Sequence, residues 1–266
     1  MVKRLVYPMI AVMCVFGMGA CSTETGAGQK RESETEIDAA HWSYEGDTNP
    51  AHWGELDQAN MACVDGTEQS PINIDFSAVE AGTTGGKTEI QYKPASFTLQ
   101  NNGHTIQANA VDSSNKTVIN GKEYKLAQFH FHTPSEHQFN GKNYEMELHL
   151  VHKDTDGKIA VIGVMIQEGE DNKTLADLWF QLPQEETEKD ISLTKPVDLQ
   201  ELLPKEQTAF HYEGSLTTPP CTEQVNWTVL EVPIEMSKEQ IEKFRKLFPD
   251  DHRPVQSLND RIIIKS

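Results

Sequence analysis

Three histidines stand at a spacing that could hold a metal ion. His130 and His132 alternate with Phe129 and Phe131, and side chains two residues apart on a β-strand point to the same face. His149 lies in a second strand-like segment, which follows after a hairpin-length connection. Three neutral imidazoles and a water are the ligands of a catalytic zinc site with an open fourth position. The spacing therefore favours a bound Zn2+, although an H-x-H pattern alone also fits buried structural histidines.

Two further polar residues could orient these rings. Gln128 and Glu147 each precede a candidate ligand by two residues, so each shares the face of that ligand. Either side chain could accept the second ring N–H of a histidine and fix its tautomer. Three other histidines are interpreted as structural, namely His137, His152 and His211.

Short alternating segments must supply the strands that position these residues. The clearest segments, broken by Gly, Asn, Asp or Pro, cover residues 97–101, 105–110, 124–132, 144–152, 159–167 and 224–232. This period of two predicts a β-rich domain. Helical patterns are sparse. Ser237 and Gln240 form a capping box before a helical run, and residues 174–180 predict a second short helix.

The composition is that of a soluble globular protein with one sizeable domain. Of its 266 residues, 37% are hydrophobic and 24% are charged. The net charge is −18, which argues against nucleic acid as a partner because phosphates require Lys and Arg. The sequence leaves the oligomeric state open, and a homodimer is one arrangement that it allows.

The first 20 residues are predicted to be a lipoprotein-type signal peptide. Lys3 and Arg4 precede an apolar run over residues 5–16, which is too short for an ordinary transmembrane helix. Small residues stand directly before Cys21, as in a bacterial lipobox, so Cys21 is expected to carry a lipid. The alternative is plain cleavage near Ala20 and a soluble exported protein.

The segment after the leader predicts a flexible tether. Residues 21–40 are small, polar and charged, and they cannot bury enough apolar surface to fold alone. The folded domain is then expected to cover residues 41–266. The whole pattern predicts an exported protein, in the periplasm or at the cell surface, anchored to the membrane surface through Cys21.

Cysteine usage fits an exported protein. Cys14 lies in the leader and Cys21 at the anchor, which leaves Cys63 and Cys221 in the body of the chain. Two cysteines in an exported domain suggest one disulfide that closes a long loop. Two buried free thiols are the alternative.

Several motifs of the body resemble those of the α-class carbonic anhydrases, in the bacterial exported branch. They follow the order of that family and comprise His52–Gly54, Gln69–Ile74, Asn102–His104, Gln128–His132, Glu147–His152 and Gly214–Cys221. The resemblance implies a mainly β (α+β) fold, with a large, twisted, mostly antiparallel central sheet and a few short surface helices. It implies Zn2+ as cofactor and reversible hydration of CO2 to bicarbonate and a proton, by attack of zinc-bound hydroxide. The three ligands would be His130, His132 and His149.

The same resemblance assigns roles to residues around the metal. Thr217 and Glu136 would orient the hydroxide, and His104 would carry protons to solvent. Thr218 and an apolar wall would bind the substrate, and the wall would consist of Val151, Val161, Leu216, Val225 and Trp227. Water molecules would be ordered by Tyr44, Asn102 and Gln107. The resemblance further implies a Cys63–Cys221 disulfide and cis peptide bonds at Ser70–Pro71 and Pro219–Pro220.

Two alternative functions stay open at this point, and one of them is a zinc hydrolase or metal-storage lipoprotein with a convergent three-histidine site. The other is a carbonic anhydrase-like lipoprotein that binds zinc without catalysis. Such proteins usually lack a ligand histidine, whereas this sequence has all three.

Overall fold

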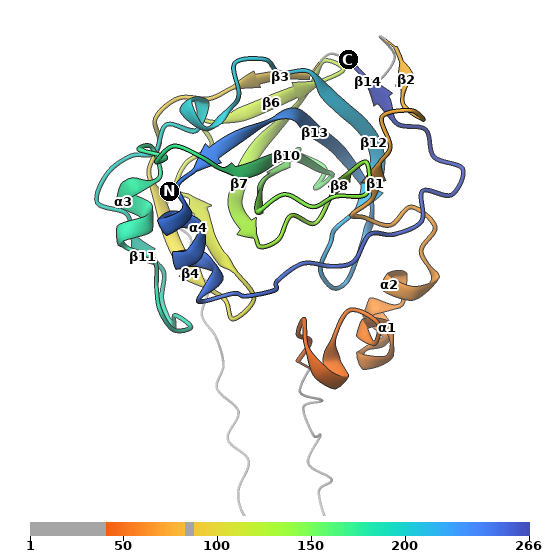
Figure 1. Ribbon diagram of the computed structural model, residues 1–266, viewed down its shortest axis with the longest axis horizontal. Coiled ribbons are helices and arrows are strands. Elements are labelled where there is room, and N and C mark those ends of the chain that lie inside the picture. Colours follow the sequence, from red (N-terminus) through yellow and green to blue (C-terminus); the bar gives the residue numbers. More distant parts are fainter. Residues whose placement is uncertain (1–40, 83–87) are drawn as a thin grey trace, which may run out of the picture. The chain divides into compact units, whose positions relative to one another are not determined.

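A large mixed sheet dominates the computed structural model, which describes residues 41–82 and 88–266. In these residues the main sheet has twelve strands, and its principal path runs β11-β4-β5-β7-β9-β10-β13-β12-β14-β2 (Figure 1). Strands β3 and β6 pair with each other, and β6 also pairs with β7. The predicted signal peptide, Cys21 and the tether all lie outside the described residues.

The strands and helices have the following bounds. The strands are β1 (Asn73–Ile74), β2 (Glu80–Ala81), β3 (Thr88–Gln91), β4 (Phe97–Asn101), β5 (Ile106–Ala110), β6 (Lys116–Ile119), β7 (Lys122–His132), β8 (Gln138–Phe139), β9 (Met146–Lys153), β10 (Ile159–Glu168), β11 (Ile191–Ser192), β12 (Ala209–Ser215), β13 (Glu223–Met236) and β14 (Ile264–Lys265). The α-helices are α1 (Trp53–Leu56), α2 (Ala62–Asp65), α3 (Ala176–Phe180) and α4 (Lys238–Arg245). Three 3-10 helices cover η1 (Gly46–Thr48), η2 (Gln58–Asn60) and η3 (Leu199–Leu202).

The predicted β-rich fold is confirmed. All six alternating segments form strands, of which β4 has the predicted bounds and β7, β10 and β13 extend further than predicted. Helix α4 begins with the predicted capping box, in which Ser237 and Gln240 satisfy each other's backbone N–H groups. The other predicted helix is α3, which begins two residues later than expected at Ala176.

Alternation along β7 and β9 gives the sheet one apolar face and one polar face. Phe129, Phe131, Leu148 and Leu150 all belong to the largest apolar core. Helices α3 and α4 close this core, because Phe131 packs edge-on against aromatic rings of both helices. Full burial of such a side chain contributes about 1.5–3 kcal/mol. The large apolar side chains thus fix which face of each strand turns to the core, and the polar side chains turn to the other face.

The sheet is mostly antiparallel, as the resemblance implied, but the centre contains a parallel pair. β9 runs antiparallel to both β7 and β10. β10 and β13 are parallel, and their register sets Val161 opposite Trp227. The β14–β2 pair is also parallel. The parallel pairing places β13, which comes late in the chain, beside β10 and the central antiparallel strands.

One disulfide joins the N-terminal segment to a late loop. Cys63, in α2, is bonded to Cys221, with a Cα–Cα distance of 5.1 Å and a sequence separation of 158 residues. The expected cis bonds are present at Ser70–Pro71 and Pro219–Pro220, and Thr133–Pro134 is cis as well. No helix among the described residues is long and apolar enough to span a membrane.

Candidate active site

Three histidine rings meet on the polar face of the central strands. His130 and His132 project from β7 and His149 from β9, and the ring centroids lie 4.7–5.2 Å apart. His130 and His149 are direct cross-strand partners. One nitrogen from each ring lies within 4.8 Å of the other two, so the three side chains could hold one metal ion.

The second nitrogen of each ring is occupied by the protein. His130 Nδ1 contacts Gln128 Oε1 at 2.8 Å, and His132 Nδ1 donates to the carbonyl oxygen of Asp251 at 2.6 Å. His149 Nε2 lies 3.0 Å from a carboxylate oxygen of Glu147. Each ring is therefore oriented by an acceptor on one side and offers its other nitrogen toward the shared centre. His132 Nε2 is buried without a hydrogen-bond partner among the described residues, which fits a metal ligand.

The Asp251 carbonyl is a partner that the sequence did not predict. It lies 119 residues from His132, and a backbone oxygen leaves no trace in the side-chain pattern. Gly163 is a second such residue, because a Cβ there would come within 2.8 Å of Glu147 Oε1. The absence of a side chain at Gly163 thus makes room for the carboxylate that holds His149.

Burial keeps the three rings in the form that a metal requires. It lowers the pKa of His130 and of His149, and it lowers the pKa of His132 to about 4. The charges of neighbouring histidines lower the pKa of His130 further. All three imidazoles are consequently neutral near pH 7, and neutral imidazole is the zinc-binding form.

Glu136 lies beside this centre without any exposure to solvent. Its Oε1 accepts the backbone N–H of Arg253 at 2.8 Å, and its Oε2 lies 3.5 Å from His132 Nε2. Burial raises the pKa of Glu136, whereas the charge of His149, the Arg253 N–H and the Thr217 hydroxyl lower it. Thr217 is buried as well and also lines the pocket described next. The structure therefore brings Glu136 and Thr217 together beside the candidate metal ligands.

A pocket of about 300 Å3 opens above His130 and His149. Its walls carry most of the predicted substrate residues, namely Val151, Val161, Leu216, Thr218 and Trp227, together with Thr217, Gln107 and Gln128. Val225 is buried in the same apolar cluster as Val161 and Trp227 but does not line the pocket. Ala127, Lys153 and Ile159 also line it, and none of them was predicted.

The strand register arranges this wall in three rows across β7, β9 and β10. The metal row consists of His130, His149 and Gly163. The valine row consists of Gln128, Val151 and Val161. The lysine row consists of Lys125, Lys153 and Ile159. A β-bulge at Ala127 lets Lys125 pair with Lys153 although it stands three residues before Gln128. Successive rows are about 7 Å apart along the strands.

The predicted water-ordering and proton-carrying residues lie outside the pocket lining, except for Gln107. The Asn102 side chain accepts the backbone N–H groups of His104 and Thr105, at 3.0 and 2.9 Å, and so holds the turn before β5. Tyr44 packs edge-on against Trp42. Burial raises the pKa of Tyr44, and the charge of Glu136 raises it further.

His104 stacks on an aromatic residue from the start of the described chain. Its ring lies parallel to that of Trp42, with centroids 3.6 Å apart, and His41 stacks near it at 5.3 Å. Burial, helped by the charge of His41, lowers the pKa of His104 to about 4. The stack joins residues 62 positions apart in the sequence, so the low pKa of His104 was not foreseeable from its neighbours along the chain.

The three histidines interpreted as structural have protein partners. His137 bridges Glu147 Oε1 and the Tyr212 hydroxyl, at 2.8 and 2.6 Å, so it also holds the acceptor of His149. His152 contacts the Tyr92 hydroxyl at 2.8 Å on the opposite face of β9. His211 contacts Ser266 Oγ at 2.8 Å.

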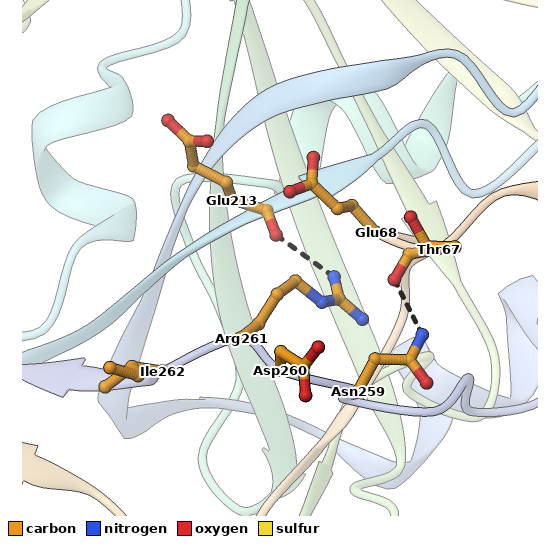
Figure 2. A pocket seen from close by; sticks show the side chains of 7 residues that line it. All are labelled: Thr67, Glu68, Glu213, Asn259, Asp260, Arg261 and Ile262. Atoms are coloured by element: carbon orange, nitrogen blue, oxygen red, sulfur yellow. Dashed lines mark hydrogen bonds between the residues drawn. The ribbon is translucent and has the colours of Figure 1, made fainter.

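A larger depression, of about 440 Å3, lies away from the histidines (Figure 2). Its Arg261 donates to the carbonyl oxygen of Glu213 at 3.0 Å, and Asn259 donates to that of Thr67 at 2.7 Å (Figure 2). Arg261 also donates to the carbonyl oxygen of Gln69. These polar groups hold chain segments together, and the depression offers no comparable set of reactive groups.

Known proteins share both the sequence and the fold. Residues 48–266 match the family described as eukaryotic-type carbonic anhydrase. A carbonic anhydrase of Klebsiella pneumoniae is 44% identical over 229 residues, which cover 85% of this chain and 92% of that protein. A carbonic anhydrase of Neisseria gonorrhoeae is 40% identical, with 85% and 88% covered.

A solved structure shows the same similarity in three dimensions. It is the α-carbonic anhydrase of Thermovibrio ammonificans in complex with the inhibitor sulfanilamide. The two structures superpose with a TM-score of 0.81 at 42% sequence identity, over 85% of this chain and 99% of that one.

Proposed function

Since the chain belongs to the α-class, or eukaryotic-type, carbonic anhydrases, we propose that it catalyses the reversible hydration of CO2 to bicarbonate and a proton. The observation that carries the proposal is the set of three neutral, pre-oriented imidazoles, of which His130 and His149 line a partly apolar pocket. The donor set fits Zn2+, which three histidine nitrogens bind in catalytic sites. His130, His132 and His149 would hold the ion.

Zinc, when bound, supplies a Lewis acid that makes hydroxide available near pH 7. The chain supplies the orientation of everything around it. Gln128, Glu147 and the Asp251 carbonyl hold the three rings, so the ligand geometry is set before the metal arrives.

Glu136 and Thr217 would orient the attacking oxygen. An ionised carboxylate can only accept hydrogen bonds, so Glu136 would accept the Thr217 hydroxyl proton. Oε1 of Glu136 is already bonded to Arg253, and Oε2 is buried without a hydrogen-bond partner among the described residues. The Thr217 oxygen would then be left to accept a hydrogen bond from the attacking oxygen, which turns a lone pair of that oxygen toward CO2.

The pocket walls suit both the substrate and the product. CO2 has no net charge and no dipole, so Val151, Val161, Leu216 and Trp227 can enclose it without leaving a polar group unsatisfied. Thr218 lines the same pocket and could donate a hydrogen bond to bicarbonate. Val225 would contribute by packing behind this wall rather than by contact with CO2.

Each turnover releases a proton, and we propose that His104 carries it to solvent. Tyr44, Asn102 and Gln107 would order the water that connects His104 to the pocket. With a pKa of about 4, the stacked ring is a poor proton acceptor at neutral pH. His104 would therefore accept the proton after its ring leaves Trp42 and becomes more exposed, which restores a pKa nearer 6.5.

We expect His104→Ala to slow turnover about tenfold or more in a buffer too bulky to enter the pocket. A positioned proton-transfer group typically contributes at least that much. Small imidazole buffer should restore part of the rate, because it can replace the missing ring. Stopped-flow hydration of CO2 at several imidazole concentrations measures both effects. A variant whose rate does not respond to imidazole would remove His104 from the proton path.

The function itself is tested by stopped-flow hydration of CO2 combined with metal analysis of the purified protein. One zinc per chain and a rate far above spontaneous hydration are expected. A zinc-loaded protein that leaves the spontaneous rate unchanged would instead support the non-catalytic zinc-binding lipoprotein.

We further propose that the protein is exported and anchored through a lipid on Cys21. The Cys63–Cys221 disulfide supports an oxidising, extracytoplasmic location. The Cys21→Ala variant should move from the membrane fraction to the soluble fraction of its host, as immunoblotting of the two fractions would show. A variant that stays with the membranes would contradict the anchor.

A further inference from the structure

Two lysines stand at the outer edge of the pocket, on the same face of the sheet as the metal ligands. Lys125 of β7 and Lys153 of β9 are direct cross-strand partners, so their side chains leave the sheet on the same side. Lys153 lies two residues beyond Val151 and lines the pocket itself. Both residues are exposed. The pair therefore places two positive charges beside the entrance to the candidate active site.

No carboxylate among the described residues neutralises Lys153, whereas the charge of Lys125 acts on Glu123. The pKa of that carboxyl is lowered by its hydrogen bond with Lys116 and also by the charges of Lys116 and Lys125. Glu123 forms its ion pair with Lys116 at 2.5 Å, and Asp154, which follows Lys153 directly, is paired with Lys122. Within the described part of the chain, Lys153 itself forms no ion pair. Its charge is left to interact with what enters from solvent.

The pair is unusual in two respects. The protein as a whole carries a net charge of −18, yet Lys153 is the one Lys, Arg, Asp or Glu among the described residues that line the pocket. Like charges directly opposite each other on neighbouring strands also destabilise a sheet. Because the cross-strand lysine pair destabilises the sheet, we infer that it serves the function of the protein and not its stability.

We propose that Lys153, reinforced by Lys125, attracts bicarbonate to the pocket and so distinguishes the anionic partner of the reaction from the neutral one. This inference rests on the proposed hydration of CO2. Bicarbonate approaching a protein with a net charge of −18 is repelled, and the lysine pair places positive charge at the entrance to the pocket. CO2 carries no charge and passes the same rim without being attracted or repelled.

The expected size follows from Coulomb's law in water. The lysine row lies two rows, or about 14 Å along the strands, from the metal row, and a long lysine side chain that leans toward the pocket brings its charge to about 10 Å from an anion there. At about 10 Å in water a unit charge changes the affinity of the anion about twofold. Replacing the charge by its opposite should change the affinity about fourfold. Salt screens such an interaction, since the Debye length falls below about 5 Å at roughly 0.5 M ionic strength.

The test measures bicarbonate binding directly. Co2+ can take the place of Zn2+ at imidazole ligands, and its visible absorption reports anion binding. Bicarbonate is titrated into the cobalt form of the wild type, Lys153→Gln and Lys153→Glu, in a sealed cell at low ionic strength. Lys205→Gln serves as the matched control, because Lys205 is also exposed. It lies before the start of β12, whereas Thr217 of the pocket follows the end of that strand.

We expect the dissociation constant for bicarbonate to rise about twofold in Lys153→Gln and about fourfold in Lys153→Glu, with no change in Lys205→Gln. These differences should vanish at about 0.5 M of a salt with a weakly coordinating anion. Lys125→Gln should show a smaller rise than Lys153→Gln. Neither glutamine variant should lower the melting temperature, because each removes a like-charge contact.

Unchanged bicarbonate affinity in Lys153→Glu, or a rise that persists at high salt, would overturn the inference. The kcat/KM for CO2 hydration of the zinc forms is measured alongside and should not change, because CO2 is uncharged. A wild type that hydrates no CO2 would refute the proposed function itself, which the binding titration does not depend on.

Discussion

His149→Ala is expected to lose zinc and CO2 hydration together. The substitution leaves two imidazoles, both from β7, where a catalytic zinc site needs three protein ligands. It also leaves Glu147 without the ring that it orients, so the carboxylate retains only its contacts with His137. We expect zinc affinity to fall by more than the 10–100-fold typical for loss of a residue that only orients a ligand. Metal analysis after dialysis against a weak chelator, followed by stopped-flow kinetics, measures both losses.

His152→Ala is the matched control for this experiment. His152 lies on the same strand, is just as buried, and contacts Tyr92 on the opposite face. Its loss should lower the free energy of unfolding by about 1–3 kcal/mol, since it removes one partner of a buried hydrogen bond. Zinc content should stay at one ion per chain. If His149→Ala keeps a full zinc ion while the control behaves as expected, His149 is not a ligand.

Thr217→Val should keep the zinc and lose most of the turnover. Valine has nearly the shape of threonine but can neither donate to Glu136 nor accept from the attacking oxygen. Removing one positioned hydrogen-bonding group from a catalytic site typically lowers kcat by about 10²–10³-fold. The fall should appear in kcat/KM for CO2 hydration, with zinc content and melting temperature close to those of the wild type.

Thr218→Val separates the two neighbouring threonines. Both line the pocket, but only Thr217 is close enough to Glu136 to lower its pKa. The Thr218 variant should therefore lose much less activity than the Thr217 variant. Equal losses in the two variants, or full activity in Thr217→Val, would contradict the proposed relay.

The strands and the candidate ligands were accessible from the sequence because both depend on local alternation. Two large aromatic residues alternate with His130 and His132, and burial of the aromatic rings leaves the histidines on the opposite face. The same rule separates His149 from His152 on β9. Helix α4 was equally accessible, since a capping box is a short-range signal.

What the sequence concealed depends on contacts between distant segments. The Asp251 carbonyl reaches His132 across 119 residues, and Trp42 covers His104 from the start of the described chain. Lys153 follows the same alternation on β9 as His149 and Val151, whereas its pairing with Lys125 depends on the bulge at Ala127 in β7, which no residue type announces. Val225 was expected at the pocket surface, but its neighbours in the apolar cluster enclose it completely.

Because the site is built from side chains on one face of β7, β9 and β10, it is sensitive to insertion or deletion of a single residue in these strands. A substitution in these strands alters one side chain, whereas removal of a single residue exchanges the two faces for the remainder of a strand. Such a shift in β9 would turn Leu148 or Leu150 toward the candidate metal site and bury His149 among the phenylalanines. The bulge at Ala127 already adds one residue to β7. It exchanges the two faces of β7 only beyond Gln128, in the lysine row, and leaves the valine row and the metal row unaffected. We therefore expect insertions and deletions in these strands to be more damaging to the site than most single substitutions.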